Sequence, residues 1–299
     1  MRITDNRQRF LIESCAVRGQ LVHLDTAWAD AQARTNYPPL IRTVLGEAFA
    51  AATLLAGTIK FDGKMTLQIR GTGPVQLLVV QVTHDARVRG LARWQAEPES
   101  ADIESLFGAD ARMVITIEAH DRAEPYQGIV PLEGKRLSDT LRSYFRNSEQ
   151  LRTELWLAVS EQTAAGLLLQ KLPASDADAW ENQVTDGWQR ALSLAATTTA
   201  DELCTLEAET LLQRLFHEEQ VRMFDKNPVR FECSCSRERT NSMLVSLGRD
   251  EVDSIVEEQK HVEIICEFCD AQYRYDVVDV AALFEGLVVD DGGSEPTRH

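Results

Sequence analysis

The pattern of apolar and polar residues divides the chain into three parts. In the first part, up to about residue 175, apolar residues alternate with polar ones in short segments bounded by turn-forming residues such as Asp62-Gly63, which predicts β-strands. These segments are 65–70, 75–82, 112–118 and 154–160. The run 41–59 is rich in small apolar residues at helical spacing and predicts a helix. Strands mixed with a helix predict an α+β fold, with a mixed α/β core domain over residues 1–175.

The second part, residues 176–231, has a helical period. Its apolar stripe consists of Leu206, Leu211, Leu212, Leu215 and Phe216. The preceding Thr197-Thr198-Thr199 disfavours continuation of a helix, because β-branched side chains lose rotamer freedom in it. Helices of this size are stable only when their apolar face packs on another element. We therefore expect an acidic helical linker whose order depends on its neighbours.

The third part, residues 232–290, is expected to form a small separate domain. A helical stretch at 239–247 precedes two strand-like runs, 261–265 and 273–275, which predict a β-hairpin. About 60 residues bury little apolar surface, and domains of this size are commonly stabilised by a metal ion. The polar tail, 291–299, is expected to be mobile.

Length and composition indicate a globular, multidomain protein, because 299 residues with 44% apolar composition can form more than one core. The first twenty residues carry charges and no apolar signal region. The sequence contains no run of about eighteen apolar residues, so we expect neither export nor membrane spanning and assign the chain to the cytoplasm.

Charge narrows the class of function. Acidic and basic residues balance up to residue 175, so the whole formal net charge of -16 lies after it. The third part also contains four paired cysteines, and a zinc ion bound by their thiolates would add about two further negative charges to it. Because nucleic-acid binding depends on neutralising phosphates with basic side chains, this distribution argues against a nucleic-acid-binding zinc ribbon.

Four of the six cysteines lie in two tight pairs, Cys233 with Cys235 and Cys266 with Cys269. In a chain without an export signal, this clustering predicts one zinc ion per chain, held tetrahedrally by four thiolates. Zinc-bound cysteines are thiolates at neutral pH, and the thiolate is the form that oxidants attack. Structural zinc contributes on the order of 10 kcal/mol to folding a small domain, so loss of these ligands should unfold it.

The other chemical candidates are weaker. Cys15 and Cys204 lie outside the pairs and are expected to be buried, inert thiols. His261 is expected to be a solvated strand residue, because four cysteines already complete a site. The sequence has no Gly-x-x-x-x-Gly-Lys-Ser/Thr loop, Gly-x-Ser-x-Gly elbow or His-Glu-x-x-His motif, and we therefore expect a protein that is not an enzyme.

Two other classes of protein use paired cysteines. A thioredoxin-like oxidoreductase has its Cys-x-x-Cys at a helix N-terminus, whereas strand-like runs flank Cys266 and Cys269. A zinc-stabilised interaction module would keep its metal under mild oxidation. The cysteine pairs alone favour such a purely structural site, so this alternative stays open.

The cysteine spacing resembles that of one known family. Cys-x-Cys, about thirty residues and Cys-x-x-Cys near the C-terminus of an acidic chain of this length resemble the heat-shock protein 33 family of bacterial chaperones. All four cysteine positions match, and the resemblance covers most of the chain. Its further segments are Gly71-Thr72-Gly73-Pro74, Val88 to Arg93, Tyr126 to Gly134 and Tyr144 to Leu151.

The resemblance implies a redox-regulated, ATP-independent holdase chaperone that is inactive while reduced and zinc-bound. In this family, oxidation would pair Cys233 with Cys235 and Cys266 with Cys269 as disulfides, release zinc, and unfold the zinc domain and then the linker. The surface exposed in this way would bind unfolding client proteins. The resemblance also implies a homodimer in the oxidised state and transfer of clients to ATP-dependent foldases.

Overall fold

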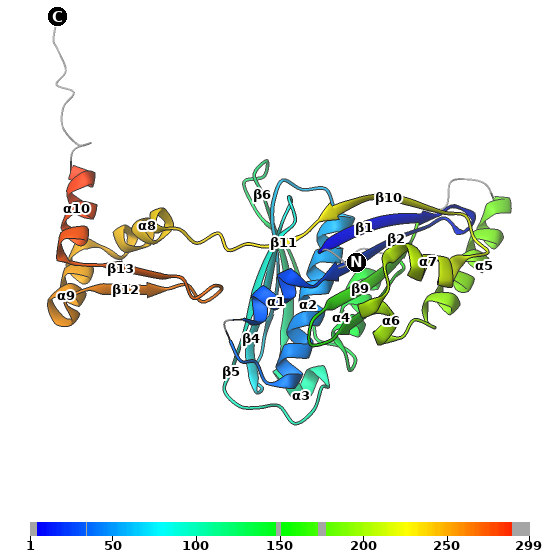
Figure 1. Ribbon diagram of the computed structural model, residues 1–299, viewed down its shortest axis with the longest axis horizontal. Helices are drawn as coiled ribbons and strands as arrows, with labels where there is room; N and C mark the ends of the chain where they lie inside the picture. Colours follow the sequence, from blue (N-terminus) through cyan, green and yellow to red (C-terminus); the bar gives the residue numbers. More distant parts are fainter. Residues whose placement is uncertain (1–4, 34, 148–150, 173–177, 289–299) are drawn as a thin grey trace, which may run out of the picture. The chain divides into compact units, whose positions relative to one another are not determined.

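The computed structural model describes residues 5–33, 35–147, 151–172 and 178–288, and the chain forms two compact units, Met1–Glu232 and Cys233–His299 (Figure 1). Both units combine helices with β-sheets, so the predicted α+β class is confirmed. The tail that we expected to be mobile, 291–299, lies outside the described residues.

Two sheets form the frame of the first unit. The five-stranded sheet has the order β10 (Val221–Pro228), β1 (Asn6–Ile12), β2 (Val17–Leu24), β9 (Ala164–Lys171) and β8 (Thr153–Val159). The six-stranded sheet has the order β11 (Arg230–Phe231), β5 (Arg87–Trp94), β4 (Val75–Thr83), β3 (Gly63–Arg70), β6 (Arg112–Ala119) and β7 (Tyr126–Pro131). The predicted strands are confirmed as β3, β4, β6 and β8. On β3, Met65, Leu67 and Ile69 are buried as their alternation predicts.

The predicted helix 41–59 is α2 (Pro39–Thr58), which contacts strands of both sheets (Figure 1). Small residues, among them Ala48 and Ala50, let the helix approach both sheets closely, and they are fully buried. By length and composition, α2 is the helix among the described residues that is apolar enough to cross a membrane. Its burial between two sheets accounts for that composition.

The remaining helices of the first unit are short, apart from α5. They are η1 (Glu13–Cys15), α1 (Thr26–Gln32), α3 (Ile103–Phe107), α4 (Leu137–Asn147), α5 (Asp178–Ala195), α6 (Ala200–Thr205) and α7 (Ala208–Phe216). The last three belong to the segment expected as a helical linker. The break predicted at Thr197-Thr198-Thr199 separates α5 from α6, where Thr199 forms a capping box with Glu202.

The apolar faces of α5, α6 and α7 pack on the five-stranded sheet. Sheet and helices share one cluster of buried side chains, to which the helices contribute Trp188, Ala191, Leu203, Leu211, Leu212, Leu215 and Phe216, and the strands contribute Phe10, Ile12, Val17, Leu21, Leu167 and Leu169. Four of the five residues of the predicted apolar stripe are buried there, and Leu206 packs against its edge. The linker helices therefore cover an apolar sheet face within the first unit.

The end of this segment differs from the helical prediction. Residues 221–231 form β10 and β11, and β10 pairs antiparallel with β1. Val221 and Met223, two residues apart, both pack against the apolar cluster beneath, a spacing that fits a strand and not a helix. Pairing with β10 also satisfies the backbone N–H and C=O groups of β1 that face away from β2.

The second unit contains α8 (Arg237–Leu247), α9 (Arg249–Gln259), β12 (Val262–Ile265), β13 (Gln272–Tyr275) and α10 (Val277–Val288). The predicted helical stretch 239–247 and the predicted hairpin are confirmed as α8 and as β12 with β13. The core of this unit is small. Its buried cluster consists of Leu244, Val252, Val256, Val262, Tyr275, Val280 and Phe284.

Candidate metal centre

The hairpin turn between β12 and β13 positions two cysteines. The Cys266 amide donates a hydrogen bond to the Ala271 carbonyl (2.9 Å), and the amides of Cys269 and Asp270 donate to the Cys266 carbonyl (3.2 and 2.7 Å). Asp270 has φ 51°, a left-handed conformation that Asp tolerates better than most residues. This tight turn holds Cys266 and Cys269 close together and confirms the predicted turn between two strands.

The other cysteine pair lies in the segment that leads into α8. In a Cys-x-Cys sequence of extended chain, both side chains point to the same side. Ser234, between them, accepts a hydrogen bond from the Arg239 guanidinium (2.7 Å). Ser236 then caps α8, because its hydroxyl accepts from the Arg239 amide (3.3 Å). The start of α8 thereby fixes the position of Cys233 and Cys235.

All four thiols converge on one point. The sulfur of Cys233 lies 3.6 Å from that of Cys266, and the sulfur of Cys235 lies 3.2 Å from that of Cys269. The four sulfurs lie within 4.8 Å of one another. A metal ion with four sulfurs at about 2.3 Å gives edges of about 3.8 Å between sulfurs. The site thus has the donor set and the spacing for one tetrahedral metal ion.

Burial of the thiols affects their ionisation. Burial raises the pKa of the Cys266 thiol and of the Cys269 thiol, which disfavours thiolates in the absence of a positive charge. A divalent cation reverses this effect by stabilising the thiolates directly. The Tyr273 hydroxyl forms a hydrogen bond with Cys235, which raises the pKa of Tyr273 to about 12. The sequence placed Tyr273 on a strand but gave no signal for this contact.

A second tyrosine joins the hairpin to α8. Tyr275 is 2% exposed, and its hydroxyl is hydrogen-bonded to the Thr240 hydroxyl and donates to the Asn241 side-chain oxygen (2.8 Å). The Arg237 guanidinium lies 4.4 Å from the centre of the Tyr275 ring. These contacts connect the segment after Cys269 with the helix after Cys235, so they fix the two cysteine pairs relative to each other.

Comparison with known proteins identifies the family of this chain. The family model described as Hsp33 protein matches residues 5–276. The chain belongs to the Hsp33 family. It is 45% identical over 284 residues to the 33 kDa chaperonin of Nitrosococcus oceani, covering 95% of this chain and 96% of the relative. It is 44% identical over 296 residues to the 33 kDa chaperonin of Chromobacterium violaceum, covering 99% and 98%.

A solved structure has the same fold. The crystal structure of the 33 kDa chaperonin of Thermotoga maritima superimposes with a TM-score of 0.78 at 21% identity, over 96% of this chain and 100% of that one. As an Hsp33 protein, the chain is a chaperone and not an enzyme, which confirms both predictions. Its four-cysteine cluster is the candidate metal centre of this chaperone.

The weaker candidates of this Hsp33 chain lie elsewhere. His261 precedes β12 and does not join the cluster of metal-suited side chains found among the described residues. Cys15 and Cys204 are buried, as expected, and burial raises the pKa of both thiols, that of Cys204 to about 11. Cys266 and Cys269 lie in a hairpin turn and not at a helix N-terminus, so the site lacks the thioredoxin-like arrangement.

Proposed function

We propose that this Hsp33 chain is a redox-regulated, ATP-independent holdase whose switch is one zinc ion bound by Cys233, Cys235, Cys266 and Cys269. The observation that carries the proposal is the convergence of four sulfurs within 4.8 Å in a unit whose buried core is small. A four-thiolate set is typical of structural zinc. Bound zinc would supply much of the folding free energy of this unit.

Oxidation removes the ligands. Two thiolates that form a disulfide lose two electrons to the oxidant, and hypochlorite as oxidant is reduced to chloride and hydroxide. We place the disulfides between Cys233 and Cys235 and between Cys266 and Cys269. The sulfur pairs at 3.6 and 3.2 Å each join the two segments, but only while the fold holds these segments together. Once the segments separate, closing a loop within a pair costs far less entropy than closing one between pairs.

The functional segments follow from this order of events. We propose a core domain over residues 1–175, a linker over 176–231, a zinc domain over 232–290 and a tail over 291–299. Unfolding of the zinc domain would precede undocking of the linker, whose short helices depend on packing. Departure of α5, α6 and α7 would then uncover the apolar face of the five-stranded sheet, and that face would bind unfolding clients.

The remaining elements of the proposal concern partners and location. The oxidised form would dimerise through newly exposed apolar surface, and bound clients would pass to ATP-dependent foldases. The chain would act in the cytoplasm, where a reducing environment keeps the four thiols available for zinc.

The experiment compares suppression of client aggregation by the reduced and the oxidised protein without ATP. We expect the reduced, zinc-loaded form to be inactive, hypochlorite to produce activity, and dithiothreitol to abolish it again. Activity that is equal before and after oxidation would favour the alternative, a zinc-stabilised interaction module without redox switching.

A further inference from the structure

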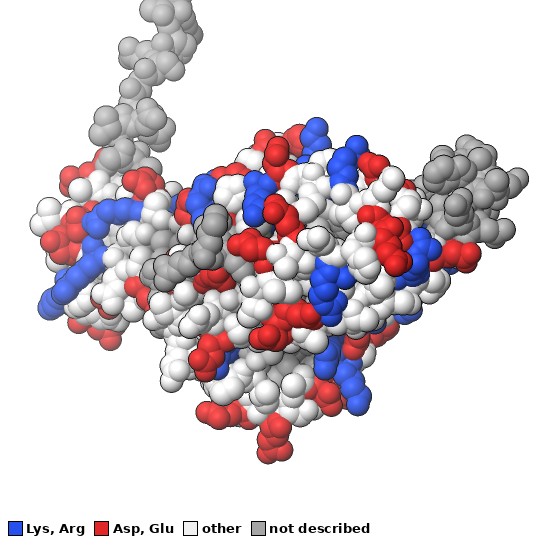
Figure 2. All heavy atoms as spheres, turned by 45° about the vertical axis from the view of Figure 1, so that its right-hand side comes forward, with Lys and Arg blue, Asp and Glu red and all other residues white. Residues whose placement is uncertain are grey.

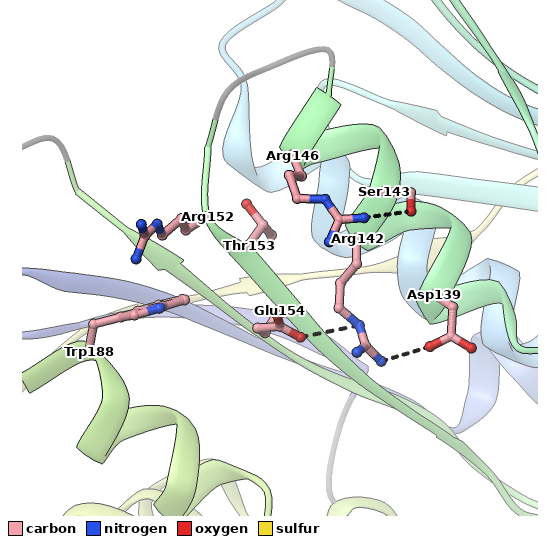
Figure 3. Close-up of a pocket in the computed structure, with 8 residues that line it drawn as sticks. All are labelled: Asp139, Arg142, Ser143, Arg146, Arg152, Thr153, Glu154 and Trp188. Carbon is pink, nitrogen blue, oxygen red and sulfur yellow. Dashed lines mark hydrogen bonds and ion pairs between the residues drawn. The ribbon is translucent and has the colours of Figure 1, made fainter. Parts of the chain in front are cut away.

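A pocket of about 510 Å³ lies in the first unit between α4, the start of β8 and α5 (Figure 3). Its lining combines three arginines, two carboxylates, two hydroxyls and one indole. Apart from Trp188, which packs in the cluster between α5 and the five-stranded sheet, the proposed function uses none of these side chains. The pocket is far richer in cations than the sequence as a whole, whose formal net charge is -16.

The two carboxylates of the pocket are already engaged. Arg142 lies between them, 2.9 Å from Asp139 and 3.2 Å from Glu154 (Figure 3). Asp139 also accepts hydrogen bonds from the backbone amides of Lys135 and Arg136 (3.0 and 3.1 Å) at the start of α4. Both carboxylates are therefore paired with Arg142, although the charge of Glu154 also acts on Arg146.

The other two arginines have no such partner. Among the described residues, neither Arg146 nor Arg152 forms an ion pair with a carboxylate, and Arg146 donates only to the Ser143 hydroxyl (3.3 Å). Arg146 lies in the last turn of α4, where the helix dipole favours a cation but does not neutralise it. Figure 3 shows Thr153 between the two arginines. Within the described part of the chain, the pocket thus presents two guanidinium groups without an ion-pair partner and one hydroxyl, that of Ser143, to one space, since the Thr153 hydroxyl donates to the Leu151 carbonyl and accepts from the Gln170 amide.

From this arrangement we infer that the pocket binds an oxyanion of the phosphate class. A guanidinium donates two parallel hydrogen bonds to adjacent oxygens of a phosphate, and such charge-assisted bonds are the strong ones in proteins. The Ser143 hydroxyl, which accepts from Arg146, supplies a further donor. The volume accommodates a diphosphate as well as a single phosphate group.

The pocket also spans a boundary that matters for the switch. Trp188 lines it from α5, whereas the arginines belong to α4 and to the start of β8. An anion in the pocket adds contacts between the first linker helix and the core, and so stabilises the docked linker. This regulatory consequence rests on the proposed function, whereas anion binding does not.

The test is isothermal titration of the reduced, zinc-loaded full chain with pyrophosphate, with inorganic phosphate and with ADP. We expect the double variant Arg146→Ala/Arg152→Ala to bind pyrophosphate at least ten-fold more weakly. The matched control is Arg70→Ala/Arg112→Ala, which removes two exposed arginines that face each other on β3 and β6. The control should bind within two-fold of the wild type.

Several results would overturn the inference. One is the absence of pyrophosphate binding to the wild type at millimolar concentration, and another is equal weakening in both double variants, which would show general charge attraction only. Circular dichroism checks the fold, and Arg146→Gln/Arg152→Gln replaces the alanine variant if that variant is misfolded. ADP binding tighter than pyrophosphate binding assigns the site to a nucleotide phosphate, and the reverse order assigns it to free phosphate.

The regulatory part has its own readout. Saturating pyrophosphate should slow the appearance of holdase activity under hypochlorite at least two-fold in the wild type and leave the Arg146→Ala/Arg152→Ala variant unchanged. Unchanged rates in a wild type that binds pyrophosphate would contradict a role in linker docking. A failure of the proposed function would be distinguishable, because the wild type would then gain no activity even without pyrophosphate.

Discussion

Phe10 on β1 and Phe216 at the end of α7 pack ring against ring, with their centroids 6.3 Å apart and their planes tilted by 35°. Each side chain is 1% exposed. The contact joins the five-stranded sheet to the last of the linker helices, which are remote from β1 in sequence. Aromatic pairs stabilise a fold by more than the apolar area they bury accounts for. This pair is therefore an important contact between the linker and the core.

Removing one ring should loosen the linker. Phe216→Ala is expected to lower the free energy of unfolding of the first unit by about 3–5 kcal/mol, as for other buried Phe to Ala changes. Holdase activity should then appear at a lower dose of hypochlorite than in the wild type. Thermal unfolding and aggregation assays measure the two effects. The control is Phe224→Ala on β10, whose ring is 40% exposed and lies beside Arg9 and Arg222.

Loss of two ligands should mimic oxidation of the zinc domain. In Cys266→Ser/Cys269→Ser, weak hydroxyl ligands replace thiolates, so zinc binding should weaken and the second unit should loosen without oxidant. Metal analysis of the purified variant and amide exchange of residues 237–288 measure this. Cys204→Ala, which changes a buried thiol of the first unit, should retain zinc. Wild-type zinc content in the double serine variant would argue against the ligand assignment.

The Tyr275 hydroxyl should set the ease of zinc release. Tyr275→Phe leaves the Thr240 hydroxyl and the Asn241 amide without their buried partner, which we expect to cost about 1–2 kcal/mol. The second unit should therefore release zinc to a chelator about ten-fold faster under the same oxidant. Tyr126→Phe, a change at an exposed residue of the first unit, serves as the control. Equal release rates in all three proteins would show that this network does not support the site.

The stability of the first unit should depend on Glu47. Burial raises the pKa of this carboxyl from 4.5 to about 7, while Arg136 lowers it and Asp139 raises it further. The folded chain therefore keeps a proton that the unfolded chain has lost, so the contribution of Glu47 to stability is present below pH 4.5 and is lost as the pH rises through about 7.

Glu47→Gln removes this titration. At pH 8 we expect the variant to have a free energy of unfolding about 2 kcal/mol higher than the wild type and a higher unfolding temperature. At pH 5 the two proteins should be closely matched in stability. Thermal unfolding at the two values of pH measures the difference. A variant that is less stable than the wild type at pH 8 would contradict this, because it would show that the negative charge of Glu47 stabilises the folded chain.

The sequence predicted those helices, strands and turns whose formation depends on residues close together in the chain. The alternation in β3, the small-residue pattern of α2 and the turn between Cys266 and Cys269 all depend on neighbours in sequence, and all three were recovered. The strand β10 was missed, because the spacing of Val221 and Met223 is too short a pattern to identify a strand and its partner β1 lies more than two hundred residues away. Residues 221–231 were therefore assigned to the helical linker.

The same distinction holds for the candidate site. The spacing of the four cysteines identified the cluster, because ligand pairs one or two residues apart are a local signature. The contacts of Tyr273 with Cys235 and of Tyr275 with Thr240 could not be predicted, since they depend on how the hairpin packs against α8. The arginine pocket likewise combines residues of three elements that only the fold brings together.

The distribution of charged side chains does not identify the proposed client-binding surface. On the face drawn in Figure 2, acidic and basic side chains are interspersed with uncharged areas. The client surface that we propose is covered by α5, α6 and α7, which is why surface composition does not reveal it. Client binding therefore requires movement of these helices after zinc is lost.

The most direct test follows zinc release and holdase activity in the same sample after hypochlorite is added. A chromogenic chelator reports zinc, and light scattering of an unfolding client without ATP reports activity. We predict release of about one zinc ion per chain, with activity that appears with or just after it and disappears on reduction. Activity that appears while zinc stays bound, or zinc release without any activity, would contradict the account.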